Sequence, residues 1–330
     1  MAKQNYTNED LLTSIKLGCM VPVDQIALSD EDILFLASEE LELPVISSVL
    51  RAREEYNVYV KQYDKVDSGR YQIPSRATGS RLRSVFCKDS SNNLYKCSEI
   101  SVDEVPLVQN SYYAQGTYDP MFYIQNDEVV FLNNTAQSIS AQYVVLHYYL
   151  EPNSLVLPER CLKITSINTA TGQIEVDERQ IPSNISAGSE IDFIQYKPSN
   201  KIKSMDIEVV SISSNTPVNS QKFITVAPGD LPDDLQVGDW IATAGESPVP
   251  QLVANLRPLL SQATICRILE SQGDNNNIAV ASKKLNDMVN SMKTLIQDRT
   301  EGNPKKIVNR TGVMRSSLIG WNGTKRNRGG

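Results

Sequence analysis

The hydrophobic residues of this 330-residue chain change their spacing twice. Towards both ends they recur every three or four positions, which is the period of an amphipathic helix. Between about 57 and 247 they alternate in short runs separated by turn residues, which is typical of strands. Many short strands with regular turns indicate a sandwich or barrel rather than a parallel sheet. We therefore predict an α+β fold.

This change of period divides the chain into four segments. Residues 1–56 and 248–302 are predicted to be the two helical parts of one bundle, and 57–247 a large inserted all-β domain, either a sandwich or barrel-like. Residues 303–330 are predicted to form an extended C-terminal arm. Because an insertion is tolerated where its two ends lie close together, we expect the first and last helices to pair.

Capping patterns locate the N-terminal helices. Thr7 and Asp10 have the spacing of a capping box and predict a short helix that ends at Gly18. Ser29 and Asp32 repeat the pattern before a longer apolar-periodic stretch. Pro44 is expected to kink or interrupt that second helix.

Two further helices are predicted after the β-rich segment. The first covers 251–271 and is expected to be interrupted by Pro258. The second has a heptad-like apolar seam over 278–296 that includes Leu285, Met288 and Met292. This seam either packs against the N-terminal helices or is shared between subunits.

Strands are predicted from alternation and from turn signals such as the one at Thr171-Gly172. After the first strands near 58–88, the predicted ranges are 121–125, 128–132, 142–150, 161–167, 173–177, 190–196, 205–212, 221–226 and 239–244.

The residues needed for common catalytic sites are scarce. The single histidine, His147, lies on a predicted strand among tyrosines, and we interpret it as a packing residue. The five cysteines include no Cys-x-x-Cys pair and are expected to be free, mostly buried thiols. No glycine-rich phosphate loop occurs. We therefore expect no enzyme activity, no cofactor and no metal site.

We also expect no membrane segment, because no apolar run approaches the roughly 18 residues that a span needs. The first seven residues lack an apolar core, so a secretory signal is not expected and the protein should be made in a cytosol.

Charge is distributed unevenly. Residues 1–60 hold 11 acidic and 4 basic residues, whereas 303–330 hold 7 basic residues and no acidic one. Apolar residues are interleaved with these basic ones, which suits an arm that docks on a partner protein and orders as it binds. An idle tail and a nucleic-acid-binding arm remain alternatives. The candidate docking residues are Lys305, Lys306, Ile307, Val308, Arg310, Arg315, Leu318 and Trp321.

Three arginines at the start of the β-rich segment are candidates for subunit or interdomain contacts. Arg76 and either Arg81 or Arg83 could bridge the first helix and the β domain, or two neighbouring subunits. The alternative is that they are exposed strand residues. Gly79 and Gly238 are expected to supply turn conformations that need no side chain.

Several stretches together resemble the neck adaptor proteins of tailed bacteriophages, also called head-tail connector proteins. The resemblance covers most of the chain, although 90–235 matches only in character, and its motifs are packing and turn motifs. The stretches are Leu12-x-x-Ile15-Lys16, Ser29-Asp-Glu-Asp-Ile-Leu, Arg53-Glu-Glu-Tyr56, Tyr71-Gln-Ile-Pro-x-Arg76-Ala-x-Gly79, Val237-Gly-Asp-Trp-Ile and Pro304-Lys-Lys-Ile-Val-Asn-Arg310.

The resemblance implies a structural virion protein of the neck, at the portal vertex, present in the host cytoplasm during viral assembly. Such proteins form a closed ring of about twelve copies, a dodecamer, on the portal protein. The bundle lines the DNA channel, through which the genome passes without specific binding, and the arm is portal-binding. The next neck or tail protein attaches below.

Three other functions remain open. One is an enzyme, such as a cell-wall hydrolase of a virion, whose activity His147→Ala would abolish while the fold stays intact. A tail or baseplate component would have a different ring symmetry and no contact with the portal. A nucleic-acid-binding protein would use the basic tail, and its duplex binding would fall steeply with salt.

Overall fold

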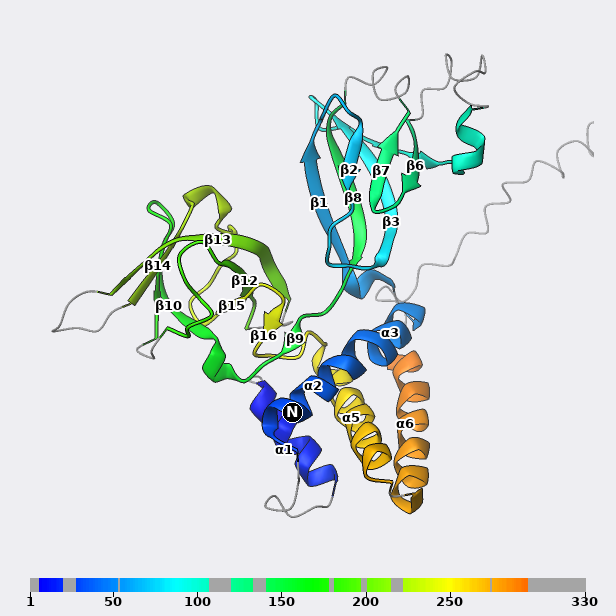
Figure 1. Ribbon diagram of the computed structural model, residues 1–330, viewed down its shortest axis with the longest axis vertical. Coiled ribbons are helices and arrows are strands. Elements are labelled where there is room, and N and C mark those ends of the chain that lie inside the picture. The colour runs from blue at the N-terminus through cyan, green and yellow to red at the C-terminus, as the bar shows by residue number, and fades with distance from the viewer. Residues whose placement is uncertain are drawn as a thin grey trace, which may run out of the picture.

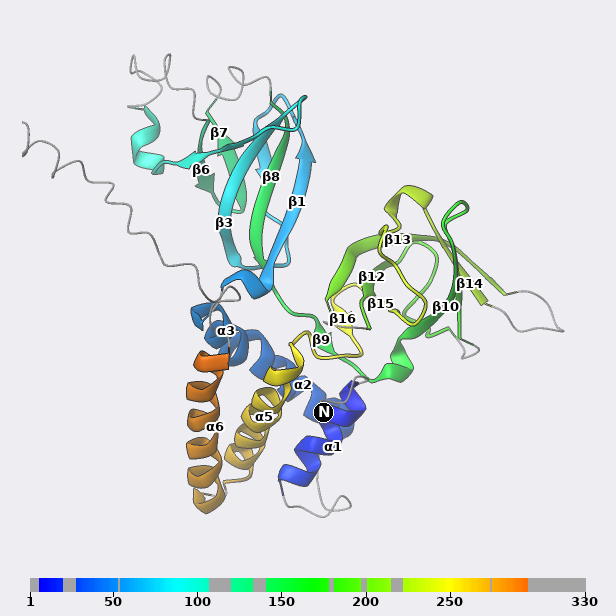
Figure 2. The ribbon, with the colours of Figure 1, turned by 180° about the vertical axis from the view of Figure 1, so that it is seen from behind.

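The structure is a computed structural model and describes residues 6–19, 28–52, 54–106, 120–132, 141–177, 181–196, 201–214, 222–273 and 275–295. It confirms the predicted α+β class, with helices and several sheets that include a six-stranded barrel. The helices lie together at one end of the molecule, one β body lies at the opposite end, and the other β body, the barrel, lies to one side (Figures 1 and 2). The predicted arm, 303–330, lies outside the described residues.

The helices begin where the capping patterns predicted. In both predicted boxes the side chain of the fourth residue accepts from the backbone N–H of the first, at 3.2 Å from Thr7 to Asp10 and 2.9 Å from Ser29 to Asp32. Pro44 lies in a π-helical turn, so the prediction of an interruption is confirmed. The N-terminal helical elements are α1 (Asn8–Gly18), α2 (Asp30–Glu40), η2 (Leu41–Val45), α3 (Ile46–Ala52) and η3 (Glu54–Asn57).

The prediction for Pro258 is wrong. It does not interrupt a helix over 251–271 but lies in the first turn of α5 (Arg257–Gln272), after the short turn η8 (Ala254–Leu256). A proline in the first helical turn loses no hydrogen bond, because that N–H has no partner within the helix. Helix α5 ends at Gly273, whose φ of 71° is left-handed, and α6 follows (Asn275–Leu295).

Helices from both ends of the chain share one hydrophobic core. Leu11 of α1, Ile33 of α2, Leu260 of α5 and Met292 of α6 are all buried in it. Helix α5 contacts α1, α2 and α6, and it runs beside α6 in both views (Figures 1 and 2). None of the described helices is long and apolar enough to cross a membrane.

The first β body is a two-sheet sandwich. One sheet has the strand order β1-β8-β3-β4 and the other β2-β7-β6-β5. Val85 and Leu146 of the first sheet share a core with Tyr71 and Phe131 of the second. The strands are β1 (Val58–Asp64), β2 (Arg70–Gln72), β3 (Ala77–Asp89), β4 (Leu94–Lys96), β5 (Ser98–Glu99), β6 (Met121–Gln125), β7 (Glu128–Phe131) and β8 (Ala141–Leu150); the turn η4 (Val102–Glu104) follows β5.

The second β body is a closed barrel with the strand order β10-β11-β14-β13-β12-β15. Its interior is apolar and includes Ile164, Ile191, Phe193 and Ile224. The strands are β10 (Leu162–Asn168), β11 (Gln173–Val176), β12 (Glu190–Ile194), β13 (Ile202–Ser214), β14 (Lys222–Val226) and β15 (Trp240–Thr243), with turns η6 (Pro158–Arg160) and η7 (Pro228–Asp230). The short parallel pair β9 (Ser154–Leu155) and β16 (Glu246–Ser247) lies between the barrel and the helices (Figure 1).

The nine strand ranges predicted after residue 120 correspond to β6, β7, β8 and β10 to β15, with ends that differ by a few residues. Within the predicted insertion 57–247, however, the strands surround two separate apolar cores. The chain runs from β8 through β9 to the barrel, so the two bodies are consecutive in sequence.

Candidate functional site

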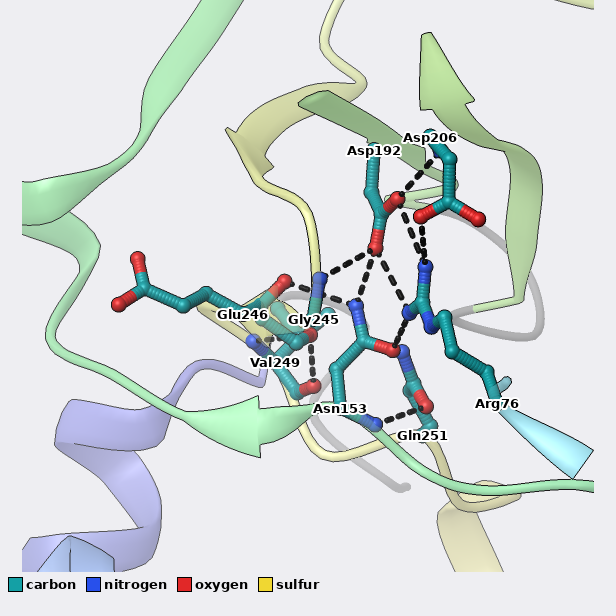
Figure 3. A network of polar contacts seen from close by, with 9 residues as sticks. Arg76, Asn153, Asp192, Asp206, Gly245, Glu246, Val249 and Gln251 are labelled. Atoms are coloured by element: carbon teal, nitrogen blue, oxygen red, sulfur yellow. Dashed lines mark hydrogen bonds and ion pairs between the residues drawn. The ribbon is translucent and has the colours of Figure 1, made fainter. Parts of the chain in front are cut away.

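Among the described residues, the polar group with the most hydrogen-bond partners is a buried carboxylate. It lies where the two β bodies and the linker between them, residues 151–161, meet (Figure 3). Asp192 on β12 is 0% exposed. It accepts hydrogen bonds from both terminal nitrogens of Arg76 at 2.9 and 2.8 Å. The side-chain amide of Asn153 donates at 2.7 Å, and the backbone N–H groups of Asp206 and Gly245 donate at 3.1 Å each. A carboxylate with this many donors is fully satisfied without water.

Arg76 connects the sandwich to this junction. It lies in the turn before β3, and its guanidinium contacts Asp192 and Asp206 of the barrel and the side-chain oxygen of Asn153. Its backbone carbonyl accepts from the N–H of Glu151 at 2.8 Å. Burial lowers the pKa of Arg76, but its hydrogen bonds and ion pairs with the two aspartates outweigh burial and raise it. The guanidinium therefore remains a cation.

The linker residue Asn153 connects the junction to the approach to α5. Its backbone N–H donates to the side chain of Gln251 at 3.0 Å, and its side-chain amide also donates to the carbonyl of Glu246 at 2.9 Å. Sandwich, barrel and linker are thereby held by one network of hydrogen bonds and ion pairs (Figure 3).

Two buried polar side chains attach the helices to the linker. The Asn8 amide at the start of α1 donates to the carbonyls of Val156 and Ser247 at 2.7 and 2.8 Å. Ser38 on α2 accepts from the N–H of Leu155 at 2.8 Å. Because unpaired buried polar groups are costly, these bonds specify one docking geometry.

The structure places the candidate contact residues in three different surroundings. Arg76 joins the two β bodies rather than the first helix and the β domain. Arg81 and Arg83 line a cleft between α3 and the base of the sandwich, together with Arg51. On α6, Met292 is 2% exposed, and Leu285 and Met288 are half-buried against the same helical core. The main contact of α6 is with α5, which is not one of the N-terminal helices named in the first interpretation. Sharing of the seam between subunits stays a prediction.

The other residues singled out from the sequence have packing roles. His147 lies 5.0 Å from the ring of Phe86, and burial together with the charge of Arg83 lowers its pKa. All five cysteines are free and buried, as predicted. Gly79 and Gly238 have left-handed φ values of 57° and 97°. Gly238 lies in a turn, as predicted, whereas Gly79 lies within β3, where the pairing with β8 is irregular. Among the described residues no group of three or more His, Cys, Asp or Glu side chains could hold a metal ion.

Sequence reasoning missed Asp192 and Asn153. Asp192 alternates with Ile191 and Phe193, which face the barrel interior, so the pattern places it on the outer face and indicates solvent. That outer face is covered by the linker and by Arg76. The signal in the sequence is that the immediate neighbours of Asp192 are apolar, namely Ile191, Phe193 and Ile194.

The arm residues Lys305, Lys306, Ile307, Val308, Arg310, Arg315, Leu318 and Trp321 lie outside the described residues. No protein-family profile and no curated protein sequence matches this chain.

Proposed function

We propose that the protein is a head-to-tail adaptor of a tailed bacteriophage. It is a structural virion protein that forms a ring on the portal, continues the DNA channel and provides the attachment surface for the next neck or tail protein. The observation that carries the proposal is the shared helical core: Leu11 and Ile33 from the N-terminal segment pack with Leu260 and Met292 from the C-terminal one. Helices α1 to α3, α5 and α6 are then the adaptor bundle, and the sandwich and barrel are its inserted module.

Charge supports passage of DNA. Residues 1–302 carry 25 basic and 39 acidic residues. A ring with this excess of negative charge repels the phosphate backbone and lets it slide without binding. The seven basic residues of 303–330 are concentrated in the segment that the proposal assigns to the portal.

The test is native mass spectrometry of the purified chain mixed with the portal protein of the same phage. The full chain should join the portal ring in about twelve copies, as expected for a closed ring with one repeated interface. A chain ending at Gly302 should remain unbound, because it lacks the arm.

A second variant separates docking from loss of the whole segment. Trp321→Ala with Leu318→Ala removes two apolar anchors and keeps all seven basic residues of the arm. It should bind the portal more weakly than the full chain if the arm docks in a groove. A full chain that ignores the portal would overturn the adaptor assignment and favour a tail or baseplate position.

A further inference from the structure

Three arginines converge on one cleft between the end of α3 and the base of the sandwich. Arg51 comes from α3, Arg81 and Arg83 from β3, and the ring of Tyr149 on β8 lies beside them. The cleft has a volume of about 660 Å³, and the only acidic residue that lines it among the described residues is Glu55. The lining therefore carries a net positive charge in a chain whose net charge is −7.

Two of these guanidinium groups have no acidic partner within the part of the chain that the structure describes. Among the described residues, no carboxylate forms an ion pair with Arg51 or Arg81. Arg81 lies over the ring of Tyr149, 5.2 Å from its centroid, which orients the guanidinium plane. A stacked guanidinium keeps its N–H donors in its own plane, where they match the two oxygens of a carboxylate. The cleft is thus suited to acidic side chains.

A complementary surface lies on α2 and the turn that follows it. Glu31, Phe35, Glu39 and Glu42 are spaced three or four residues apart and line a groove of about 650 Å³, and Leu43 follows them. Phe35 is 63% exposed and Leu43 is 72% exposed. We name these five residues the acidic stripe. Large exposed apolar side chains bordered by charges are characteristic of interaction sites.

Two carboxylates of the acidic stripe, Glu39 and Glu42, repel each other. Burial raises the pKa of Glu42, and the charges of Glu151 and Glu39 raise it further. Among the described residues no cation forms an ion pair with Glu31, Glu39 or Glu42. A cation supplied by another molecule would relieve this repulsion.

Among the described residues, the two surfaces form no ion pair with each other within one chain. Glu39 and Arg51 lie on one continuous run of helical turns, α2 to α3, and are twelve residues apart, which corresponds to roughly 18 Å at 1.5 Å per residue. An arginine side chain does not extend that far. We propose that the arginine cleft of one copy receives the acidic stripe of a second copy.

This contact joins two different surfaces, so it is heterologous and leaves each pair of copies with one free cleft and one free stripe. Such contacts repeat into a ring when the rotation between neighbouring copies closes, and into an open filament when it does not. The pairing itself is independent of the proposed function, and only its closure into a portal-sized ring rests on it.

Charge reversal tests the pairing by sedimentation velocity of full-length chains at an ionic strength of about 0.05 M, where screening is weak. The cleft variant is Arg51→Glu with Arg81→Glu, and the stripe variant is Glu31→Arg with Glu39→Arg. Each should remain monomeric at concentrations at which the unaltered protein assembles. An equimolar mixture of the two should assemble again, because each acidic surface then meets a basic one. Recovery in the mixture also shows that both variants fold.

The matched control is Lys283→Glu with Lys284→Glu on the exposed face of α6, which changes net charge as much as the cleft variant does. It should assemble like the unaltered protein. Unaltered protein that stays monomeric, a cleft variant that still assembles, or a mixture that stays monomeric would each overturn the pairing. Portal binding by the full chain would leave the adaptor function standing in all three cases. Assembly through the cleft without portal binding would support the pairing and overturn the adaptor function.

Discussion

At the scale of single residues, the buried carboxylate of Asp192 depends on the cation of Arg76. We predict that Arg76→Ala lowers the free energy of unfolding by about 3–5 kcal/mol, because it leaves a charge at 0% exposure without its counter-charge. Urea unfolding followed by tryptophan fluorescence measures this, since Trp240 lies on barrel strand β15, next to β12.

The matched control is Arg70→Ala. Arg70 also forms an ion pair, with Glu128 at 2.9 Å, but both side chains are more than a third exposed. Surface ion pairs contribute about 0–1 kcal/mol, so this change should be nearly neutral. Equal losses from the two substitutions would contradict the view that burial makes Arg76 important.

At the scale of elements, α6 has one face that is packed in the helical core and one face that is exposed. Met292→Ala should lower the free energy of unfolding by about 2–5 kcal/mol, because its side chain is 2% exposed in the shared helical core. Val280→Ala on the same helix should cost under about 0.5 kcal/mol, since Val280 is 71% exposed. Thermal unfolding monitored by circular dichroism compares the two. A large loss from Val280→Ala would show that the outer face of α6 is covered by another molecule.

Local patterns determine most element boundaries in this chain, which is why they could be predicted. The capping boxes at Thr7 and Ser29 and the interruption at Pro44 involve residues a few positions apart. Pairing between strands that are distant in sequence leaves no local pattern of this kind. An example is the pairing of β1 with β8, in which Tyr63 lies opposite Val144. The division of the insertion into sandwich and barrel depends on these long-range pairs.

The junction shows the same limit. Arg76 could be named as a contact residue from its motif, but Asp192 is 116 positions away and lies on a strand whose alternation indicates solvent. Only the three-dimensional arrangement shows that the linker covers that face.

At the scale of the whole molecule, the separation of charge leads to a prediction about DNA. A chain ending at Gly302 should not retain duplex DNA at about 0.05 M salt. It has 39 acidic and only 25 basic residues, and this excess of negative charge repels phosphate. The full chain adds seven basic residues, so any retention it shows should come from the arm and should fall steeply as salt is raised. Fluorescence anisotropy of a labelled duplex measures both.

The portal decides between an arm that docks on protein and one that binds nucleic acid. If the arm docks on the portal, saturating portal protein should remove all retention of DNA by the full chain, because the basic residues are then covered. If the arm is a nucleic-acid-binding element, retention should persist with portal present, and each phosphate contact should add about 0.9 to the slope of log affinity against log salt. Persistent retention with a slope near that of six or seven contacts would therefore assign the arm to DNA and move the protein away from the portal.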